Sequence, residues 1–328
     1  MAGEFDLIAR HFTRPPARAH SPDRGSTQRV ALGVGDDCAL LRPTAGMQLA
    51  VSCDMLVEGR HFLATVAPER LGHKALAVNL SDLAACGAEP LACTLALALP
   101  RADEVFIAGF AKGLFALADA HGIELVGGDT TAGSLNICIT VIGQLPPGQA
   151  LLRSGARVGD DLWVSGTLGD ARLALEVFRG SVALGGGDFE TVRLAMELPQ
   201  PRVALGLALR GIASSAIDLS DGLAGDIGHV LQRSGVGATV LADALPRSAI
   251  LAAQTLALQH ECLLAGGDDY ELLFTAAPAQ RDAVLAAGRL ASVAVTRCGS
   301  VDMQPGLRVV DADGRPLNRA FRGWDHFA

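Results

Sequence analysis

The sequence predicts an α/β protein with two domains, and three observations support this prediction. Short apolar runs that suit strands alternate with longer Ala- and Leu-rich runs that suit helices. The chain has 328 residues, half of them hydrophobic, which is enough for two domains with their own cores. A stretch rich in Pro and Gly, PPGQALLRSGARVGDD, interrupts the alternation near residue 150. We therefore expect domains at 1–149 and 150–328.

The first domain alternates strands and helices in a simple order. Two long Ala- and Leu-rich runs favour helices, and the apolar runs around them favour strands. The expected strands are 47–53, 91–99, 122–128 and 135–145, and the expected helices are 69–85 and 104–122.

The second domain continues the alternation. The expected elements are a strand at 162–166, a helix at 170–180, helical segments to about Arg210, a strand at 237–242 and a helical stretch at 248–258. The glycines near residue 185, in GSVALGGGDFE, are interpreted as a surface loop. A nucleotide cradle is disfavoured because no strand-loop-helix frame with a lysine follows them.

Two tripeptides recur at the same separation. LSD ends at Asp82 and GGD at Asp129, and LSD ends again at Asp221 and GGD at Asp268. Either this is chance in a chain rich in Leu and Gly, or the two halves share a duplicated layout.

Charge and cysteine usage narrow the classes of partner and compartment. The net charge is −8, and no basic stripe is present that would follow a nucleic-acid backbone. The seven cysteines are scattered and never spaced as CxxC, so we expect neither a disulfide framework nor a zinc site. The most apolar run, LACTLALALP, is too short to span a membrane. We expect a cytoplasmic protein without nucleic-acid or membrane partners.

Aspartates repeatedly stand beside Gly or Ser at the ends of apolar runs, where ligands bind in open α/β sheets. One such aspartate is most often a helix cap or a turn residue. Several brought together repel one another unless cations lie among them, and Mg²⁺ prefers carboxylate, water and phosphate oxygens. The set therefore indicates a phosphate site with several Mg²⁺ ions; its members are Asp36, Asp37, Asp54, Asp82, Asp129, Asp218 and Asp221.

Other phosphate and catalytic motifs are missing. There is no Walker A sequence, no protein-kinase motif set, no GxSxG elbow and no GxGxxG opening a βαβ unit. Lys74 and Lys112 are the only lysines, so an arginine has to assist the metals at the phosphates. Arg153, at the expected domain junction, is the candidate, although a surface structural role is the alternative.

The ordered motif set resembles the thiamine-monophosphate kinases from residue 3 to residue 327. It consists of GEFDLIARHF, GVGDDCALL, SCDMLVEGRHF, KALAVNLSDLAACGAEP, GGDTTAG, SAIDLSDGLAGDIGH, GGDDYELLFT and GWDHF. The resemblance implies an α/β (α+β), two-domain PurM-like architecture in which each domain is a mixed sheet packed with helices. Relatives in that superfamily are aminoimidazole ribonucleotide synthetase, selenophosphate synthetase and HypE.

The resemblance also implies an activity and partners. The expected reaction transfers the γ-phosphoryl group of ATP to thiamine monophosphate, with several Mg²⁺ ions, giving thiamine diphosphate and ADP. The first domain would bind ATP and Mg²⁺ and form a homodimer, and the second would complete the nucleotide and substrate site. Because the acceptor is already a phosphate oxyanion, the task is alignment of two polyanions and no strong general base is required.

Roles follow residue by residue from the matching motifs. The implied Mg²⁺ ligands are Asp37, Asp54, Asp82, Asp129, Asp218 and Asp221, with metal contacts also at Ser52 and Cys53; Asp82, Asp129 and Asp221 are the expected catalytic residues; Gly128, Asp129, Arg153 and Ser220 are nucleotide contacts; His61, Asp268 and Trp324 are substrate contacts. Asp82 is expected on a helix packed against the sheet.

Three positions depart from the family pattern. The family commonly has Thr at Cys53, Glu at Asp268 and Tyr at Trp324, so a hydroxyl contact is lost at Cys53 while the other two positions keep their chemical type. Asp226 either supports the site or faces water. Tyr270 is expected in the core, and Phe110 either borders the adenine or belongs to a helix core.

Two alternatives stay open. One is another ATP-dependent synthetase of the superfamily, which is disfavoured because Cys38 lies inside GDDC and the sequence ends in HFA rather than in a cysteine. The other is a non-catalytic sensor of thiamine phosphates or nucleotides, against which the full set of aspartates argues.

Overall fold

The computed structural model describes residues 4–14, 29–317, 319–321 and 323–324. The chain forms two compact units. Unit 1 comprises residues 1–83 and 88–148, and unit 2 comprises residues 84–87 and 149–328. Each unit has its own mixed sheet packed with helices, as the sequence predicts.

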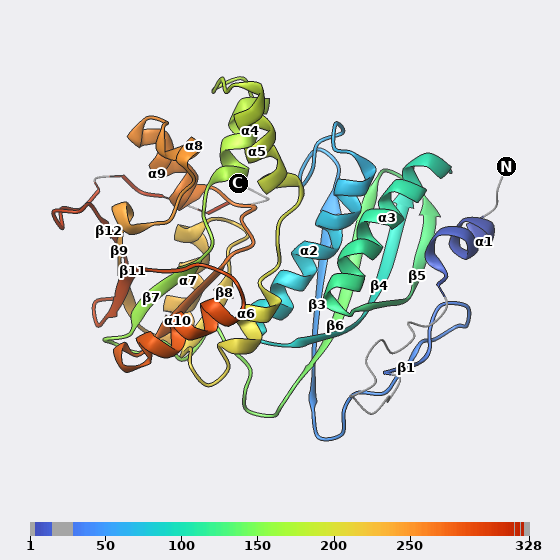
Figure 1. Ribbon diagram of the computed structural model, residues 1–328, viewed down its shortest axis with the longest axis horizontal. Coiled ribbons are helices and arrows are strands. Elements are labelled where there is room, and N and C mark those ends of the chain that lie inside the picture. Colours follow the sequence, from blue (N-terminus) through green and yellow to red (C-terminus); the bar gives the residue numbers. More distant parts are fainter. Residues whose placement is uncertain (1–3, 15–28, 318, 322, 325–328) are drawn as a thin grey trace. The chain divides into compact units, whose positions relative to one another are not determined.

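Unit 1 is built on a four-stranded sheet of order β3-β6-β4-β5, in which only the β4/β5 pair is parallel. Helices α2 and α3 lie on one face of this sheet (Figure 1). Its elements are α1 (Glu4–Leu7), the π-helix η1 (Ile8–Phe12), β1 (Val30–Leu32), β2 (Leu40–Leu41), β3 (Gln48–Val57), α2 (Pro68–Cys86), β4 (Glu89–Leu99), α3 (Glu104–His121), β5 (Glu124–Ala132) and β6 (Asn136–Leu145).

Helices α2 and α3 approach each other closely through glycines. A Cβ on Gly72 would lie 1.9 Å from the carbonyl oxygen of Phe110, and a Cβ on Gly113 would lie 1.8 Å from that of Glu69. Since any side chain would overlap backbone, these positions require glycine for the observed packing. Phe110 is fully buried here, which supports its helix-core interpretation.

The two faces of the unit 1 sheet differ in burial. Ile137, Ile139 and Val141 of the central strand β6 are buried. On the edge strand β3, in contrast, Val51 is 65% exposed and Met55 is 52% exposed. Successive side chains of a strand point to opposite faces, so one face is covered by helices and the other is open and apolar.

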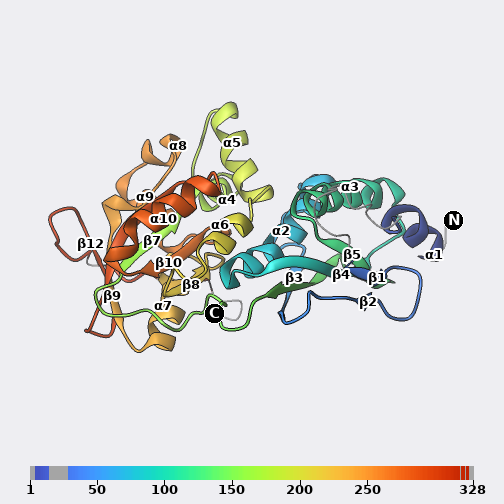
Figure 2. The ribbon, with the colours of Figure 1, turned by 60° about the horizontal axis from the view of Figure 1, so that its bottom comes forward.

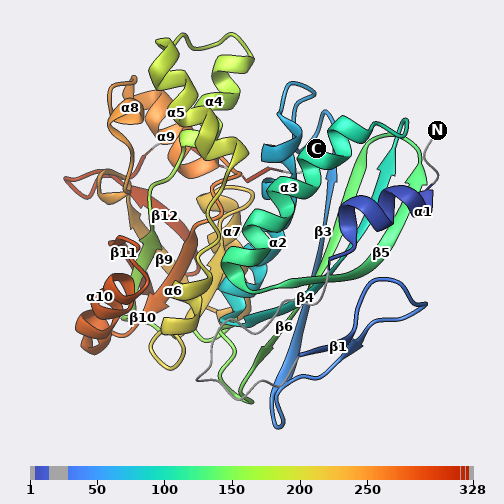
Figure 3. The ribbon, with the colours of Figure 1, turned by 45° about the vertical axis from the view of Figure 1, so that its right-hand side comes forward.

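The β1/β2 hairpin packs beside β5 (Figure 3). Val30 shares a buried cluster with Leu91, Ala92 and Val126, and Arg29 Nη2 donates to Glu89 Oε1 at 2.6 Å. The loop between β1 and β2 carries the GVGDDC motif.

Unit 2 contains a six-stranded sheet of order β12-β9-β11-β7-β10-β8, in which only β12/β9 is parallel. Helices α7 and α10 lie on opposite sides of it (Figure 2). Its elements are β7 (Asp161–Ser165), α4 (Asp170–Phe178), α5 (Gly186–Glu197), α6 (Val203–Ala208), β8 (Ser215–Asp218), α7 (Leu223–Ser234), β9 (Gly237–Leu241), the 3-10 helix η2 (Ala242–Ala244), α8 (Ala249–Ala252), α9 (Leu256–Ala265), β10 (Leu272–Ala276), the 3-10 helix η3 (Pro278–Gln280), α10 (Arg281–Leu290), β11 (Val295–Asp302) and β12 (Gly306–Val310).

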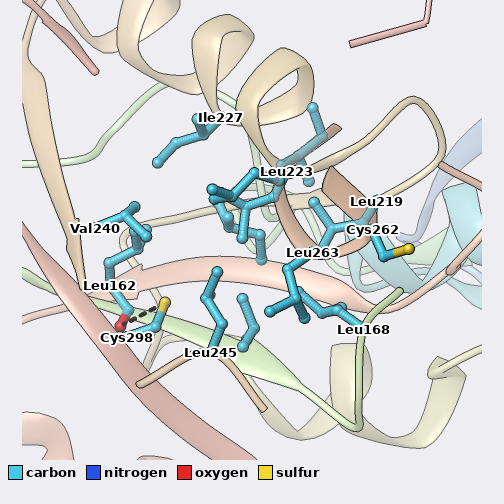
Figure 4. Close-up of a cluster of buried hydrophobic side chains, with 14 of the residues drawn as sticks. Leu162, Leu168, Leu219, Leu223, Ile227, Val240, Leu245, Cys262, Leu263 and Cys298 are labelled. Carbon is cyan, nitrogen blue, oxygen red and sulfur yellow. Dashed lines mark hydrogen bonds between the residues drawn. The ribbon is translucent and has the colours of Figure 1, made fainter. Parts of the chain in front are cut away.

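The main core of unit 2 lies on the α7 side of the sheet. Leu162, Leu223 and Leu263 belong to one buried cluster that joins β7, α7 and α9 (Figure 4). Trp163, one residue along β7, has the opposite orientation and stacks on Phe274.

Two sequence expectations for unit 2 are wrong in detail. The expected loop around residue 185 becomes helix α5 from Gly186, because Phe189, Val192 and Met196 give it an apolar face that packs with the core. The expected helix at 248–258 is divided into α8 and α9, because the Thr255 side chain accepts from the Leu258 N–H and caps a new helix.

The repeated tripeptides do not mark equivalent structures. Asp82 lies in α2 and Asp129 in β5, whereas Asp221 and Asp268 lie in loops that flank α7 and β10. This favours chance recurrence over a duplicated layout. Among the helices of the described residues, none is long and apolar enough to cross a membrane.

Candidate functional site

The first group of expected site residues lies where β3 meets α2, in unit 1. Ser52 Oγ donates to Asp82 Oδ2 at 2.5 Å, and the Asp54 N–H donates to Asn79 Oδ1 at 3.0 Å. Asn79 and Asp82 are three residues apart on α2 and share a helix face. The helix therefore holds Asp82 against the strand that carries Ser52 and Asp54.

Cys53 points away from this group. Its neighbours Ser52 and Asp54 face α2, and strand alternation turns Cys53 to the open face, where its Sγ lies 3.3 Å from Cys138 Sγ. Burial raises the pKa of the Cys138 thiol to about 11, with Cys53 and Asp54 adding to the effect. A metal contact by Cys53 beside Asp82 would therefore have to use its backbone carbonyl.

His61 is fixed in the turn that follows β3. The Val57 N–H donates to His61 Nδ1 at 2.9 Å, while the His61 N–H donates to the Val57 carbonyl at 3.0 Å. A nitrogen that accepts a hydrogen bond carries no proton, so the neutral ring holds its proton on Nε2. His61 is thus prepared as a hydrogen-bond donor through Nε2.

The second group of unit 1 lies at the β5 edge of the sheet. Gly128 has a φ of 147°, and a Cβ there would lie 1.8 Å from the Leu95 carbonyl oxygen. Asp129 is in register with Ala96 and, through β6, with Met55, so it faces the open side. Strands β3 and β5 are the two edges, about 14 Å apart over three strand spacings. Asp37 lies in the loop of the β1/β2 hairpin, and β1 packs beside β5.

In unit 2, three aspartates gather where β8 ends and α7 begins. Asp226 is 3% exposed, and its Oδ2 accepts from the Asp221 N–H at 3.1 Å. Burial raises the pKa of Asp226 to about 8, and the charges of Asp218 and Asp221 contribute further. Of the two roles left open for Asp226, the structure favours support of the site over exposure to water.

Two other segments of unit 2 join this group through backbone hydrogen bonds. The Asp268 N–H donates to the Ser220 carbonyl at 2.8 Å, and the Trp324 N–H donates to the Asp221 carbonyl at 2.9 Å. The Trp324 side chain is 47% exposed, whereas Tyr270 is 8% exposed and belongs to the core. The structure thus brings together the expected nucleotide residue Ser220 and the expected substrate residues Asp268 and Trp324.

Arg153 lies apart from Ser220. Its carbonyl accepts from Ser234 Oγ at 3.1 Å, at the C-terminal end of α7, whereas Ser220 precedes the N-terminal end. At 1.5 Å per residue, the helix is about 18 Å long. Arg153 lines an open, polar hollow of about 480 Å³ together with His229, Gln232 and Arg233.

The carboxylates suit a hard cation that keeps part of its water shell. Within the ranges that the structure describes, no three His, Cys, Asp or Glu side chains are arranged to hold a metal by themselves. Mg²⁺ is usually held by one or two carboxylates, with waters and substrate phosphates as further ligands. The crowding around Asp226 and the Ser52–Asp82 oxygen pair fit that donor chemistry.

Some residues that shape these groups were not predicted from sequence patterns. Asn79 is in the same NLSD motif as Asp82, which offered a signal through its i, i+3 spacing. Asp269 accepts from the Gly169 N–H at 2.9 Å, and burial raises its pKa well above the usual range. Nothing in the local sequence distinguishes it from the neighbouring Asp268.

Comparison with protein families shows to which broad class of proteins this chain belongs. Residues 35–145 match the family described as AIR synthase related protein, N-terminal domain, and residues 157–312 match AIR synthase related protein, C-terminal domain. HypE structures at 20% identity and a TM-score of 0.75 share the fold.

The chain belongs to the thiamine-monophosphate kinase family. It is 45% identical to the Salmonella typhimurium thiamine-monophosphate kinase, over 99% of this chain and 98% of that protein. The Escherichia coli K12 protein of the same name is 43% identical over the same shares. The Stenotrophomonas maltophilia thiamine-monophosphate kinase structure has a TM-score of 0.83 at 48% identity, covering 88% of this chain and 92% of that one.

Proposed function

We propose that this chain is a kinase that transfers the γ-phosphoryl group of ATP to thiamine monophosphate. Relatives named for this activity match it over nearly their full length. A 30% identical structure is described as AaThiL complexed with AMPPCP and TMP; its TM-score is 0.76, and the match covers 87% of this chain and 89% of that one. The observation on this chain that carries the proposal is the hydrogen-bonded group of Ser220, Asp221, Asp268 and Trp324.

The proposed roles in substrate binding follow from the chemistry of each side chain. Trp324 offers an exposed aromatic face to the cationic thiazolium ring, and Asp268 accepts hydrogen bonds from the aminopyrimidine. His61 donates from Nε2, since its Nδ1 is already occupied by the Val57 N–H. These residues bind and orient an acceptor whose phosphate oxygen needs no general base.

The nucleotide and metal roles remain those implied by the motifs. Gly128, Asp129, Arg153 and Ser220 contact the nucleotide, and Asp82, Asp129 and Asp221 are the catalytic aspartates. When bound, Mg²⁺ would neutralise and align the two polyanions. The proposed metal contacts are Asp37, Ser52, Cys53 through its carbonyl, Asp54, Asp82, Asp129, Asp218 and Asp221.

We assign different roles to the two domains. Residues 1–149 form the ATP- and Mg²⁺-binding and dimerisation domain, and residues 150–328 supply further nucleotide and substrate contacts. The domain motifs support this division, since the metal residues from Asp37 to Asp129 precede residue 150 and Ser220, Asp268 and Trp324 follow it.

The homodimer is proposed to form through the open face of the unit 1 sheet. That face presents Leu49, Val51 and Met55, each more than half exposed, in a row along β3. Large exposed apolar patches mark interaction surfaces. Asp129 is on the same face, so it would lie in or beside the interface. Sedimentation of Val51→Lys, which places a charge in this row, should show a smaller species than the wild type.

We also propose a cytoplasmic location. None of the seven cysteines forms a disulfide, including Cys53 and Cys138, whose sulfurs lie 3.3 Å apart. Reduced thiols are typical of that compartment.

The deciding experiment is turnover. Purified protein is incubated with ATP, Mg²⁺ and thiamine monophosphate, and ADP and thiamine diphosphate are separated by chromatography. We expect stoichiometric thiamine diphosphate from the wild type and almost none from Asp82→Asn. Asp119→Asn is the matched control, because Asp119 is an exposed carboxylate of α3 that pairs with Arg14 at the surface.

Two other outcomes of this experiment would indicate a different function. Consumption of ATP without thiamine diphosphate would indicate another synthetase of the superfamily. Binding of both ligands without turnover would indicate a sensor.

A further inference from the structure

A buried ion pair lies beside the segment that carries Asp268. Arg202 Nε donates to Glu271 Oε2 at 2.7 Å, and Arg202 Nη2 donates to Glu271 Oε1, so the ion pair is bidentate. Ser165 Oγ donates to the same carboxylate. The Glu271 side chain is only 6% exposed. Arg202, just before α6, thus neutralises the carboxylate that directly precedes β10.

The position of the Glu271 carboxylate is fixed from the backbone side as well. Gly166 has a φ of 56°, and a Cβ there would lie 2.0 Å from Glu271 Oε1. The Leu272 N–H donates to Ser165 Oγ at 2.8 Å. The end of β7 therefore packs closely around the Glu271 carboxylate and hydrogen-bonds to the start of β10.

The segment from Asp268 to Glu271 has an unusual backbone. Asp268 has a φ of 72° and Tyr270 a φ of 52°, and among the described residues only Ser292 shares a positive φ without being glycine. Such conformations persist where the surroundings determine them strongly. Here the Tyr270 N–H donates to the Leu219 carbonyl, and the Glu271 carbonyl accepts from the Leu219 N–H, both at 2.8 Å.

We infer that the Arg202–Glu271 pair is a positioning device for Asp268, and hence for thiamine monophosphate; this inference rests on the proposed function. The pair anchors the C-terminal end of the segment, three residues from Asp268. Neither residue needs to touch the substrate. Without the arginine, a buried carboxylate is left next to Asp269, whose pKa burial already raises. The segment would then rearrange, and Asp268 would lose its place beside Ser220.

The same strand offers a matched control. Asp161, at the other end of β7, is also 6% exposed and accepts two hydrogen bonds from Arg281, at 2.6 and 2.8 Å, and a longer one from Arg297, at 3.3 Å. Arg281 is more exposed than Arg202, and Asp161 lies in register with Ala276, at the opposite end of β10 from the Asp268 segment. If Arg202 contributed only to stability, loss of either arginine would have the same effect on substrate binding.

The test compares Arg202→Met with Arg281→Met in steady-state kinetics and thermal unfolding. For Arg202→Met we expect the KM for thiamine monophosphate to rise by about tenfold, with kcat changed by less than about threefold. For Arg281→Met the KM should stay within about twofold of the wild type. The KM for ATP should rise less than that for thiamine monophosphate, because Ser220 also follows β8, which pairs with β10 along its length.

Arg202→Lys keeps the experiment decisive if Arg202→Met does not fold. Lysine retains the positive charge but cannot form the bidentate contact, so an intermediate rise in the KM for thiamine monophosphate is expected. Equal KM values for the Arg202 and Arg281 variants, or an Arg202→Lys protein with wild-type KM, would overturn the positioning role. A wild type that makes no thiamine diphosphate would instead overturn the proposed function itself.

Discussion

Replacing Gly113 by alanine should destabilise unit 1, although helix propensity alone predicts the opposite. Alanine in a helix interior is favoured over glycine by about 1 kcal/mol. The new Cβ would lie 1.8 Å from the Glu69 carbonyl oxygen, so α3 and α2 would have to separate. Overpacking of this kind costs about 1–3 kcal/mol, and the upper end applies because the contact is backbone rather than a flexible side chain.

The net loss for Gly113→Ala is therefore about 1–2 kcal/mol, which corresponds to a Tm lower by about 3–6 °C. Differential scanning calorimetry gives this value directly. Gly228→Ala is the control, because Gly228 is an exposed glycine of α7 with nothing within 4 Å of its added Cβ. That variant should be more stable than the wild type by up to about 1 kcal/mol. A Gly113→Ala protein as stable as Gly228→Ala would refute the close α2–α3 contact.

Three further outcomes are expected. Ser52→Ala should raise the Mg²⁺ concentration for half-maximal activity by about tenfold without lowering Tm, because it removes the hydroxyl bound to Asp82; an unchanged metal titration would contradict this. Cys53→Ala should keep activity within about twofold, since the side chain faces away from Asp82, and a large loss would show a side-chain role. Arg281 holds the pKa of Asp161 below its usual value, so this carboxylate stabilises the fold above its unfolded pKa and the contribution disappears as pH falls through the lower folded value. The stability deficit of Asp161→Asn in urea unfolding should accordingly be largest near pH 7 and shrink below about pH 4, and a constant deficit would contradict the assignment.

Sequence patterns were sufficient for most of the fold because the apolar runs have clear lengths and periods. The strands around 48–57 and 136–145 and the helices at 68–86 and 104–121 are where the pattern predicts them. The prediction failed near residue 185, where three glycines indicated a loop although the apolar spacing that follows them is helical. Local composition and longer-range packing disagreed there, and packing decided the structure.

The residues of the candidate site could be predicted from the sequence, but which of them lie together in space could not. Motifs identify Asp82 and Asp129, yet only the order and register of the sheet show that Asp129 lies on the edge strand β5, opposite the edge strand β3 against which α2 holds Asp82. The orientation of Cys53 likewise depends on strand phase, which its departure from the family motif does not reveal. Asp226 remained ambiguous because its burial is a property of the completed fold.

The open face of the unit 1 sheet affects how measurements on this protein have to be made. If a second copy covers Val51 and Met55 as proposed, the folded state is coupled to association, and mass action makes its apparent stability depend on protein concentration. Melting curves recorded at micromolar concentration would then overstate the stability of the enzyme in assays at much higher dilution. Specific activity that falls on dilution would be a property of the assembly equilibrium rather than of the catalytic residues.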